Sequence, residues 1–161
     1  MKDNIQLTDY ISAFISSKGI TDVFQMSGGM ITQIIDKISQ NEAIKVHSLF
    51  HEQSCAFAVS AYGRIHKKPS VALATSGPGA TNLVTGLADA MIDSTPLVCI
   101  TGQVFAHLLG TDAFQETDVI NITMPVTKWN YQITDATEIP GILAKAFYLA
   151  RSGRPGPVLI D

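Results

Sequence analysis

The chain has 161 residues, a net charge of -3 at pH 7 and 16% charged side chains, against roughly 25% in an average soluble domain. This length fits one domain with a sizeable hydrophobic core. The eleven lysine and arginine residues are scattered, so the charge pattern does not indicate a nucleic-acid-binding surface. With 46% hydrophobic residues, we expect part of the apolar surface to meet another chain or domain.

Two uncharged runs, residues 69–88 and 94–111, are long enough to raise the question of a membrane span. Glycines interrupt both runs and favour a buried strand followed by a loop, so we expect no membrane segment. The first ten residues show neither a secretory signal nor an Arg-rich leader. Cys55 and Cys99 lie in apolar contexts without metal-ligand or redox spacing, which favours reduced core cysteines in a cytoplasmic protein.

Apolar residues alternate between helical spacing and short strand-like runs along the whole chain. In the first half, the expected elements are a helix capped by Thr8 and ending at 18–19, a strand at 23–26, a helix at 31–38, a strand within 44–50 and a helix from Glu52. In the second half, they are a strand at 70–75, a helix from the loop at 76–79 to about 92, a strand at 96–101, a mostly irregular stretch at 102–124, a strand around 126–133, a helix at 137–151 and a strand at 157–160. This alternation predicts an α/β fold with a parallel sheet of about six strands, covered by helices on both faces.

Several chemically distinctive segments directly follow predicted strands. They are residues 27–29, Glu52, residues 76–82 and the pair Gly102-Gln103. Ligands of open parallel sheets bind at the carboxyl ends of the strands, where backbone amides and helix N-termini are accessible. Any one of these segments can be an ordinary tight connection, but together they predict a binding site.

Glu52 begins a segment that is otherwise small and apolar and carries no further charge before Arg64. A helix that is apolar on all sides is normally buried. One interpretation is that the acid simply favours the positive end of the helix dipole. The other is a carboxyl group held partly out of water so that it exchanges a proton with a ligand. Its position in the sequence does not decide between them.

Two common ligand sites are poorly supported by the sequence. The loop at 76–82 imitates part of a dinucleotide-binding fingerprint, but Asn82 replaces its third glycine and no acidic residue ends the following strand. His47, His51 and Glu52 suggest a metal cluster, yet they lack the His-Glu-x-x-His order and span a predicted strand-to-helix junction. We therefore predict neither NAD binding nor metal ligands in this chain.

Five sequence blocks carry a more specific signal: FHEQ at 50–53, TSGPGATN at 75–82, TGQV at 101–104, GTDAFQETD at 110–118 and SGRPGPV at 152–158. Together they resemble the N-terminal domain of thiamine-diphosphate-dependent enzymes, and within this group the large subunit of the acetolactate synthase (acetohydroxyacid synthase) family. The blocks occur in the family's order and cover nearly the whole chain. Ordered agreement over several blocks is far more specific than any single motif.

The resemblance implies a thiamine-diphosphate-binding fold and a role for each matched residue. Glu52 would bond a ring nitrogen of the cofactor's aminopyrimidine and favour the imino tautomer, which then takes the proton from the thiazolium carbon. Gly28 and Gly29 would approach the pyrimidine, and Pro78 and Asn82 would line the same site. The substrate would be a 2-keto acid, and the favoured reaction is carboligation of pyruvate in branched-chain amino acid biosynthesis.

The reaction centre is implied by the same resemblance. Gln115 would donate a hydrogen bond to a developing oxyanion, and Phe105 and Phe114 would line the substrate channel. The chain departs from the family at Met26-Ser27, where Tyr-Pro is usual, and at Phe105, where proline is usual. The substrate therefore stays open: another decarboxylase or oxidase of 2-keto acids, or a non-catalytic assembly module of the same fold, are the alternatives.

The family holds the cofactor's diphosphate through Mg²⁺, with a Gly-Asp-Gly motif in a separate C-terminal domain. This sequence contains no Gly-Asp-Gly. We therefore expect residues 1–161 to be a single pyrimidine-binding domain, the N-terminal part of a longer enzyme, with Mg²⁺ ligands supplied by that other domain or by a partner chain. Because the family's active site lies between subunits, the resemblance also implies a homodimer or a larger homo-oligomer.

Overall fold

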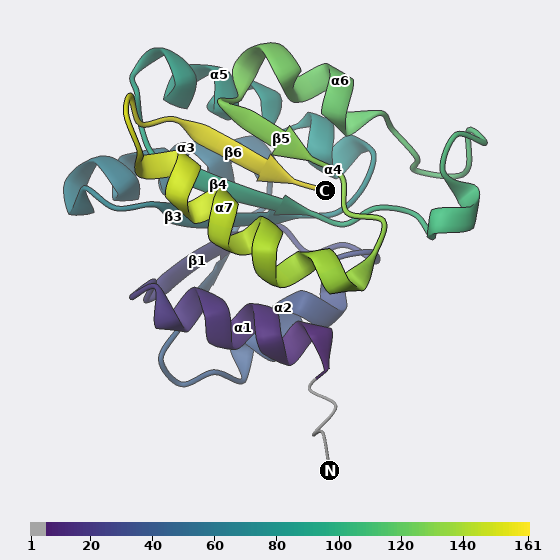
Figure 1. Cartoon of the computed structure of the whole chain (residues 1–161), viewed down its shortest axis with the longest axis horizontal. Helices are drawn as coiled ribbons and strands as arrows, with labels where there is room; N and C mark the ends of the chain where they lie inside the picture. The colour runs from purple at the N-terminus through teal and green to yellow at the C-terminus, as the bar shows by residue number, and fades with distance from the viewer. Residues whose placement is uncertain (1–5) are drawn as a thin grey trace.

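The computed structural model describes residues 6–161, which form one six-stranded, entirely parallel sheet (Figure 1). The strands are β1 (Asp22–Gln25), β2 (Lys45–Ser48), β3 (Ser70–Ala74), β4 (Leu97–Thr101), β5 (Trp129–Tyr131) and β6 (Pro157–Ile160). Their order across the sheet is β2-β1-β3-β4-β6-β5. Every residue of β3, β4 and β6 is buried, as expected for central strands covered on both faces. The predicted α/β class and the six parallel strands are confirmed.

Helices cover both faces of the sheet. They are α1 (Leu7–Ser17), α2 (Thr32–Ser39), α3 (Glu52–His66), α4 (Pro78–Thr81), α5 (Val84–Ile92), α6 (Val119–Thr123) and α7 (Ile139–Arg151), with 3₁₀ turns η1 (Ala106–Leu108), η2 (Met124–Val126) and η3 (Ala136–Glu138). Side chains of α1, α2 and α7 share one hydrophobic core with the sheet, and those of α3, α5 and α6 share the other (Figure 1). None of the helices among residues 6–161 is long and apolar enough to cross a bilayer.

The core on the α3 and α5 face is built from small side chains. Because successive strand residues point to opposite faces, β3 places Ala72 and Ala74 beneath these helices and its larger valine and leucine on the other side. The two helices also pack closely against each other, since a Cβ added to Gly86 of α5 would lie 2.3 Å from the Cβ of Ala56 in α3. This close packing holds the N-terminal end of α3, and therefore Glu52, near the carboxyl edge of the sheet.

Several predicted boundaries differ from the structure. The helix cap predicted at Thr8 is wrong, because α1 already begins at Leu7 and the extended Gln6 precedes it. The helix expected up to about residue 92 is broken at Asn82 and Leu83, which separate α4 from α5.

Two elements in the second half also differ. The stretch expected to be mostly irregular contains α6, which begins where the side chain of Asp118 accepts a hydrogen bond from the Asn121 amide. The strand expected around 126–133 is limited to β5, because the 3₁₀ turn η2 occupies residues 124–126.

The strand order creates a topological switch point at the carboxyl edge of the sheet, between β1 and β3. From β1 the chain leaves through α2 on one face, and from β3 it leaves through α4 and α5 on the other. Neighbouring strands whose connections diverge in this way leave room for a ligand between their ends. The residues after β1, β2 and β3 must therefore supply the walls of any site located there.

Candidate functional site

Three segments meet at this edge of the sheet: the loop after β1 (residues 26–30), the beginning of α3, and the loop with α4 after β3 (residues 75–82). They contain all of the residues predicted to bind the cofactor. The loop after β4 joins them, since a Cβ on Gly102 would lie 2.5 Å from the backbone oxygen of Met30. Segments far apart in the sequence therefore form one continuous rim.

Glu52 is the first residue of α3, and its side chain is buried with 7% exposure. The helix cap is supplied by the preceding residue: His51 is extended, and its Nδ1 accepts a hydrogen bond from the Gln53 amide at 3.1 Å. Glu52 thus lies at the favourable end of the helix dipole but is not needed as the cap. A dipole interaction alone would not require the carboxyl group to be buried, so the burial favours a role in binding.

One oxygen of the Glu52 carboxyl group is held by the protein and the other is not. The side-chain amide of Asn82 donates a hydrogen bond of 2.9 Å to Oε2. Among residues 6–161, no hydrogen bond reaches Oε1, and a Cβ on Gly79 would lie only 3.1 Å from that atom. Oε1 is therefore the carboxyl oxygen that lies beside the glycine backbone without a donor from the described residues, so it is the oxygen available to a ligand.

No cation compensates Glu52 within the part of the chain that the structure describes, where each of the ion pairs joins other residues. Burying a carboxyl group without a cationic partner costs free energy, which the hydrogen bond from Asn82 offsets only in part. One helical turn on, burial raises the pKa of the Cys55 thiol to about 12, with a smaller contribution from the nearby Glu52. Cys55 is therefore a protonated, unreactive core residue, and Glu52 is the better candidate for a chemical role.

Thr75, at the end of β3, is the point where the glycine loops meet. A Cβ on Gly28 would lie 2.5 Å from the Cβ of Thr75, and a Cβ on Gly79 would lie 2.7 Å from its Cγ2. Its hydroxyl also accepts a hydrogen bond of 3.3 Å from the Met30 amide. Both glycines are thus required for close packing around Thr75. Gly29 differs, since a Cβ there would meet nothing within 4 Å.

Pro78, the first residue of α4, is exposed at the rim beside the buried Gly79. Sequence reasoning assigned a role to Pro78 but none to Thr75 or Gly79, although both lie in the TSGPGATN block. The signal in the sequence for these two residues was the glycine-rich loop directly after a strand. Such a loop indicates that two backbone segments come close together, but not which side chains meet there.

The predicted reaction-centre residues lie on a long connection between β4 and α6, residues 104–117, which we call the Gln115 loop. It extends from the carboxyl edge at the right of Figure 1. Gln115 has a φ of 62°, and its backbone oxygen would lie 2.6 Å from a Cβ on Gly77, which has a φ of 58°. The structure therefore brings the backbone of Gln115 to the loop after β3, and glycine at position 77 permits that contact.

The Gln115 loop is also organised internally. The carboxylate of Glu116 accepts hydrogen bonds from the backbone amides of Gly110, Thr111 and Ala113. The bond from Gly110 is the main reason why the pKa of Glu116 is lowered. Phe114 is 87% exposed on this loop.

Phe105 is 67% exposed and stacks on His107, with ring centroids 6.0 Å apart. Within the described chain, neither Phe105 nor Phe114 has an aromatic contact or hydrogen bond to Glu52. Both rings present apolar surface to solvent.

The histidines considered as metal ligands have other partners. His47 pairs with Asp22, with Nε2 and Oδ1 2.8 Å apart, and His51 caps α3. Residues 6–161 contain no group of three His, Cys, Asp or Glu side chains that could hold a metal ion. The residues around Glu52 suit the pyrimidine end of a cofactor, because they combine a buried carboxyl group with nearby glycine backbone, but the described residues offer no metal-mediated site for a diphosphate.

Residues 5–122 match the family model described as thiamine pyrophosphate enzyme, N-terminal TPP binding domain. The chain therefore belongs to this family of thiamine-diphosphate-binding domains. It is 49% identical over 154 residues to acetolactate synthase 2, chloroplastic, of Nicotiana tabacum, covering 96% of this chain and 23% of that protein. It is 48% identical over 153 residues to acetolactate synthase, chloroplastic, of Arabidopsis thaliana, covering 95% and 23%.

A third relative, probable acetolactate synthase 2, chloroplastic, of Oryza sativa subsp. japonica, is 49% identical over 153 residues, covering 95% of this chain and 23% of that protein. The chain thus spans about a quarter of the length of these relatives. The resemblance to acetolactate synthases and the expectation of a thiamine diphosphate cofactor are confirmed.

The predicted cytoplasmic location is contradicted by these comparisons, because the relatives are named as chloroplastic proteins. The prediction depended on reduced core cysteines. Buried, protonated thiols are compatible with any reducing compartment, so they do not identify the cytoplasm.

Proposed function

We propose that residues 1–161 form the pyrimidine-binding domain of a longer thiamine-diphosphate-dependent enzyme that acts on 2-keto acids. The favoured reaction is acetolactate-synthase-like carboligation of pyruvate, a transferase step in branched-chain amino acid biosynthesis. The observation that carries the proposal is the buried Glu52 carboxyl group, with Oε2 held by Asn82 and Oε1 beside Gly79 without a donor from the described residues. The relatives named acetolactate synthase support the choice of reaction.

In this proposal Glu52 is the catalytic residue. Its Oε1 would carry a proton and donate it in a hydrogen bond to a ring nitrogen of the aminopyrimidine. Asn82 keeps the carboxyl group oriented through Oε2. Gly79 and Gly28 keep the glycine loops packed on Thr75 beside Glu52, and burial of Glu52 limits the access of water to the proton. Thiamine diphosphate, when bound, supplies the carbon nucleophile that attacks the keto carbon.

The Gln115 loop supplies the substrate side of the proposed site. Its contact with Gly77 joins it to the loop that carries Asn82. The amide of Gln115 is then available to donate a hydrogen bond to the oxygen of the reacting keto group, where negative charge develops. Phe105 and Phe114 would form apolar walls once another part of the enzyme covers them.

The remaining half of the site is assigned to other parts of the enzyme. We assign the Mg²⁺ ligands for the diphosphate to a separate C-terminal domain or to a partner chain, because the described residues contain no suitable cluster. A homodimer or larger homo-oligomer is part of the proposal. Its support is exposed apolar surface at Phe50, which is 98% exposed beside Glu52, and at Phe114, which is 87% exposed.

The proposal is tested with the full-length protein, thiamine diphosphate and Mg²⁺. We expect the wild type to consume pyruvate and the Glu52→Gln variant to lose on the order of a hundredfold or more in turnover, while its oligomeric state and melting temperature stay near those of the wild type. The matched control is Glu42→Gln, which makes the same change at an exposed position and is expected to leave turnover unchanged.

Two outcomes would contradict the proposal. A wild-type protein that binds the cofactor but turns over no 2-keto acid would remove the enzymatic function and favour an assembly module. Full turnover in Glu52→Gln would remove the role given to Glu52.

A further inference from the structure

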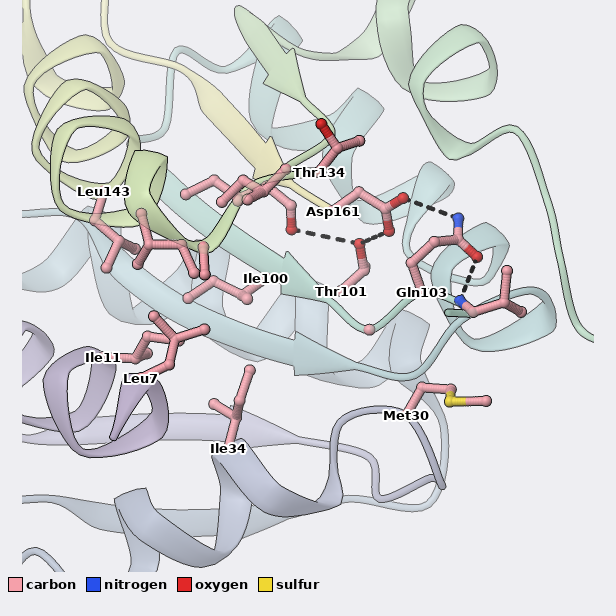
Figure 2. Close-up of a pocket in the computed structure, with 16 residues that line it drawn as sticks. Leu7, Ile11, Met30, Ile34, Ile100, Thr101, Gln103, Thr134, Leu143 and Asp161 are labelled. Carbon is pink, nitrogen blue, oxygen red and sulfur yellow. Dashed lines mark hydrogen bonds between the residues drawn. The ribbon is translucent and has the colours of Figure 1, made fainter. Parts of the chain in front are cut away.

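A second buried carboxyl group lies at the same edge of the sheet. Asp161 follows β6, is 8% exposed, and lines one end of an otherwise mostly apolar cavity of about 330 Å³ (Figure 2). Its Oδ1 accepts a hydrogen bond of 2.6 Å from the Thr101 hydroxyl, and its Oδ2 accepts one of 2.9 Å from each of Gln103 and Gln132. Three neutral donors from two segments, residues 101–103 and Gln132, therefore converge on one carboxylate.

Burial raises the pKa of Asp161, while the hydrogen bonds from Thr101, Gln132 and Gln103 oppose that shift. No cation pairs with it in residues 6–161. A buried acid without a cation is retained at a cost, and core packing alone would be better served by an apolar residue. The role of Asp161 therefore depends on the side chains that these three hydrogen bonds hold in place.

Gln103 is the donor that connects Asp161 to the Gln115 loop. Its Nε2 donates both to Asp161 Oδ2 and, at 3.1 Å, to the backbone oxygen of Thr117. Its Oε1 accepts a hydrogen bond of 2.9 Å from the backbone amide of Val104 (Figure 2). One amide side chain thus bonds the first and the last residue of the loop, and both of its Nε2 hydrogens are used.

The loop has few other directional connections to the sheet. The carboxylate of Glu116 binds amides of the loop itself, and Gln115 meets the sheet edge through its backbone contact with Gly77. Val104, the first residue of the loop, and Val119, two residues after its end, are buried. Their packing limits how far the ends of the loop can move, but it does not fix how the loop is rotated. Orientation of the loop therefore depends on the hydrogen bonds of Gln103.

We propose that Asp161 and Gln103 are positioning residues that orient the Gln115 loop for the reaction. Asp161 fixes the rotamer of Gln103, and Gln103 then joins the two ends of the loop that carries Phe105, Phe114 and Gln115. The inference rests on the proposed function, because it concerns the approach of the 2-keto acid. It assigns to Asp161 and Gln103 a role beyond folding.

The chain provides a matched control. Gln132 donates to the same Oδ2 at the same 2.9 Å, but it follows β5 and has no bond to the loop. Gln103→Leu and Gln132→Leu each remove one hydrogen bond from Asp161, and only the first releases the loop. Comparing them separates positioning of the loop from stabilisation of the sheet edge.

The experiment measures kcat and KM for pyruvate, the cofactor dissociation constant and the melting temperature of the full-length enzyme. We expect kcat/KM to fall about tenfold to a hundredfold in Gln103→Leu, the scale of a misplacement of about 1 Å, with cofactor affinity near the wild-type value. Gln132→Leu should keep kcat/KM within about twofold of the wild type. Asp161→Leu, which removes both acceptor oxygens, should resemble Gln103→Leu.

Equal losses of kcat/KM in Gln103→Leu and Gln132→Leu would overturn the inference and leave a purely structural role. So would a Gln103→Leu variant with wild-type kcat and KM. A wild type without any 2-keto acid turnover would instead contradict the proposed function, so the two failures are distinguishable.

Discussion

Asn82 and Glu52 are 30 positions apart in the sequence, yet the amide of Asn82 lies 2.9 Å from Oε2 of Glu52. The pair forms because Asn82 lies at the end of α4, and the glycine loop before α4 packs against the beginning of α3, where a Cβ on Gly79 would lie 3.1 Å from Oε1 of Glu52.

Replacing Asn82 by alanine should weaken cofactor binding as well as folding. The change leaves a buried carboxyl oxygen without its donor, which costs about 1–3 kcal/mol and allows the Glu52 side chain to change its rotamer. We expect the cofactor dissociation constant, measured calorimetrically with Mg²⁺ present, to rise about tenfold.

The neighbouring Thr81→Val variant serves as a control for the Asn82 prediction, because the Thr81 hydroxyl donates only to the Pro78 oxygen within α4. It should bind the cofactor as the wild type does. Identical affinities for Asn82→Ala and wild type would show that Asn82 does not orient Glu52.

The adjacent glycines 28 and 29 should respond differently to alanine. In Gly28→Ala the new methyl group would lie 2.5 Å from the Cβ of Thr75, so the free energy of unfolding should fall by about 1–3 kcal/mol. In Gly29→Ala the methyl group meets nothing within 4 Å, and stability should stay within about 0.5 kcal/mol of the wild type.

Urea unfolding monitored by circular dichroism measures both changes. Gly29→Ala also tests the predicted approach of Gly29 to the pyrimidine, because a stable protein with weakened cofactor binding would support it. Equal destabilisation by the two variants would mean that the contact around Thr75 does not decide the stability of this loop.

A third prediction concerns the opposite end of β1, where Asp22 lies between β2 and α3. Although burial opposes it, hydrogen bonds from His47, Tyr62 and Thr21 lower the pKa of Asp22 from 3.8 to about 2. Because the pKa is lower in the folded state, the ionised carboxylate contributes stability above about pH 4, and this contribution is lost as the pH falls toward 2. The effect amounts to about 2 kcal/mol.

The Asp22→Asn variant should therefore lose about 2 kcal/mol of unfolding free energy at pH 7 and much less near pH 2. Urea unfolding at a series of pH values measures the difference between variant and wild type. Asp36→Asn, at an exposed position on α2, is a suitable comparison. A constant difference from pH 7 to pH 2 would contradict the assignment to the charge of Asp22.

Much of the fold was predictable because its signals are local. Helical spacing of isoleucines predicted α2, and uninterrupted apolar runs predicted β3, β4 and β6, since each period reflects the geometry of one element. Glu52 was conspicuous because it is the only acid in an apolar segment. The ordered sequence blocks then indicated the cofactor, which the family match confirmed.

Contacts between elements could not be read from these periods. The sequence does not show that Asn82 reaches Glu52, that the glycine loops meet at Thr75, or that Asp161 binds Gln103. Each contact depends on the order of strands in the sheet and on which face each crossover takes. These are properties of the packed chain, so the sequence determined the elements and the identity of Glu52, while only the tertiary structure decided which side chains surround it.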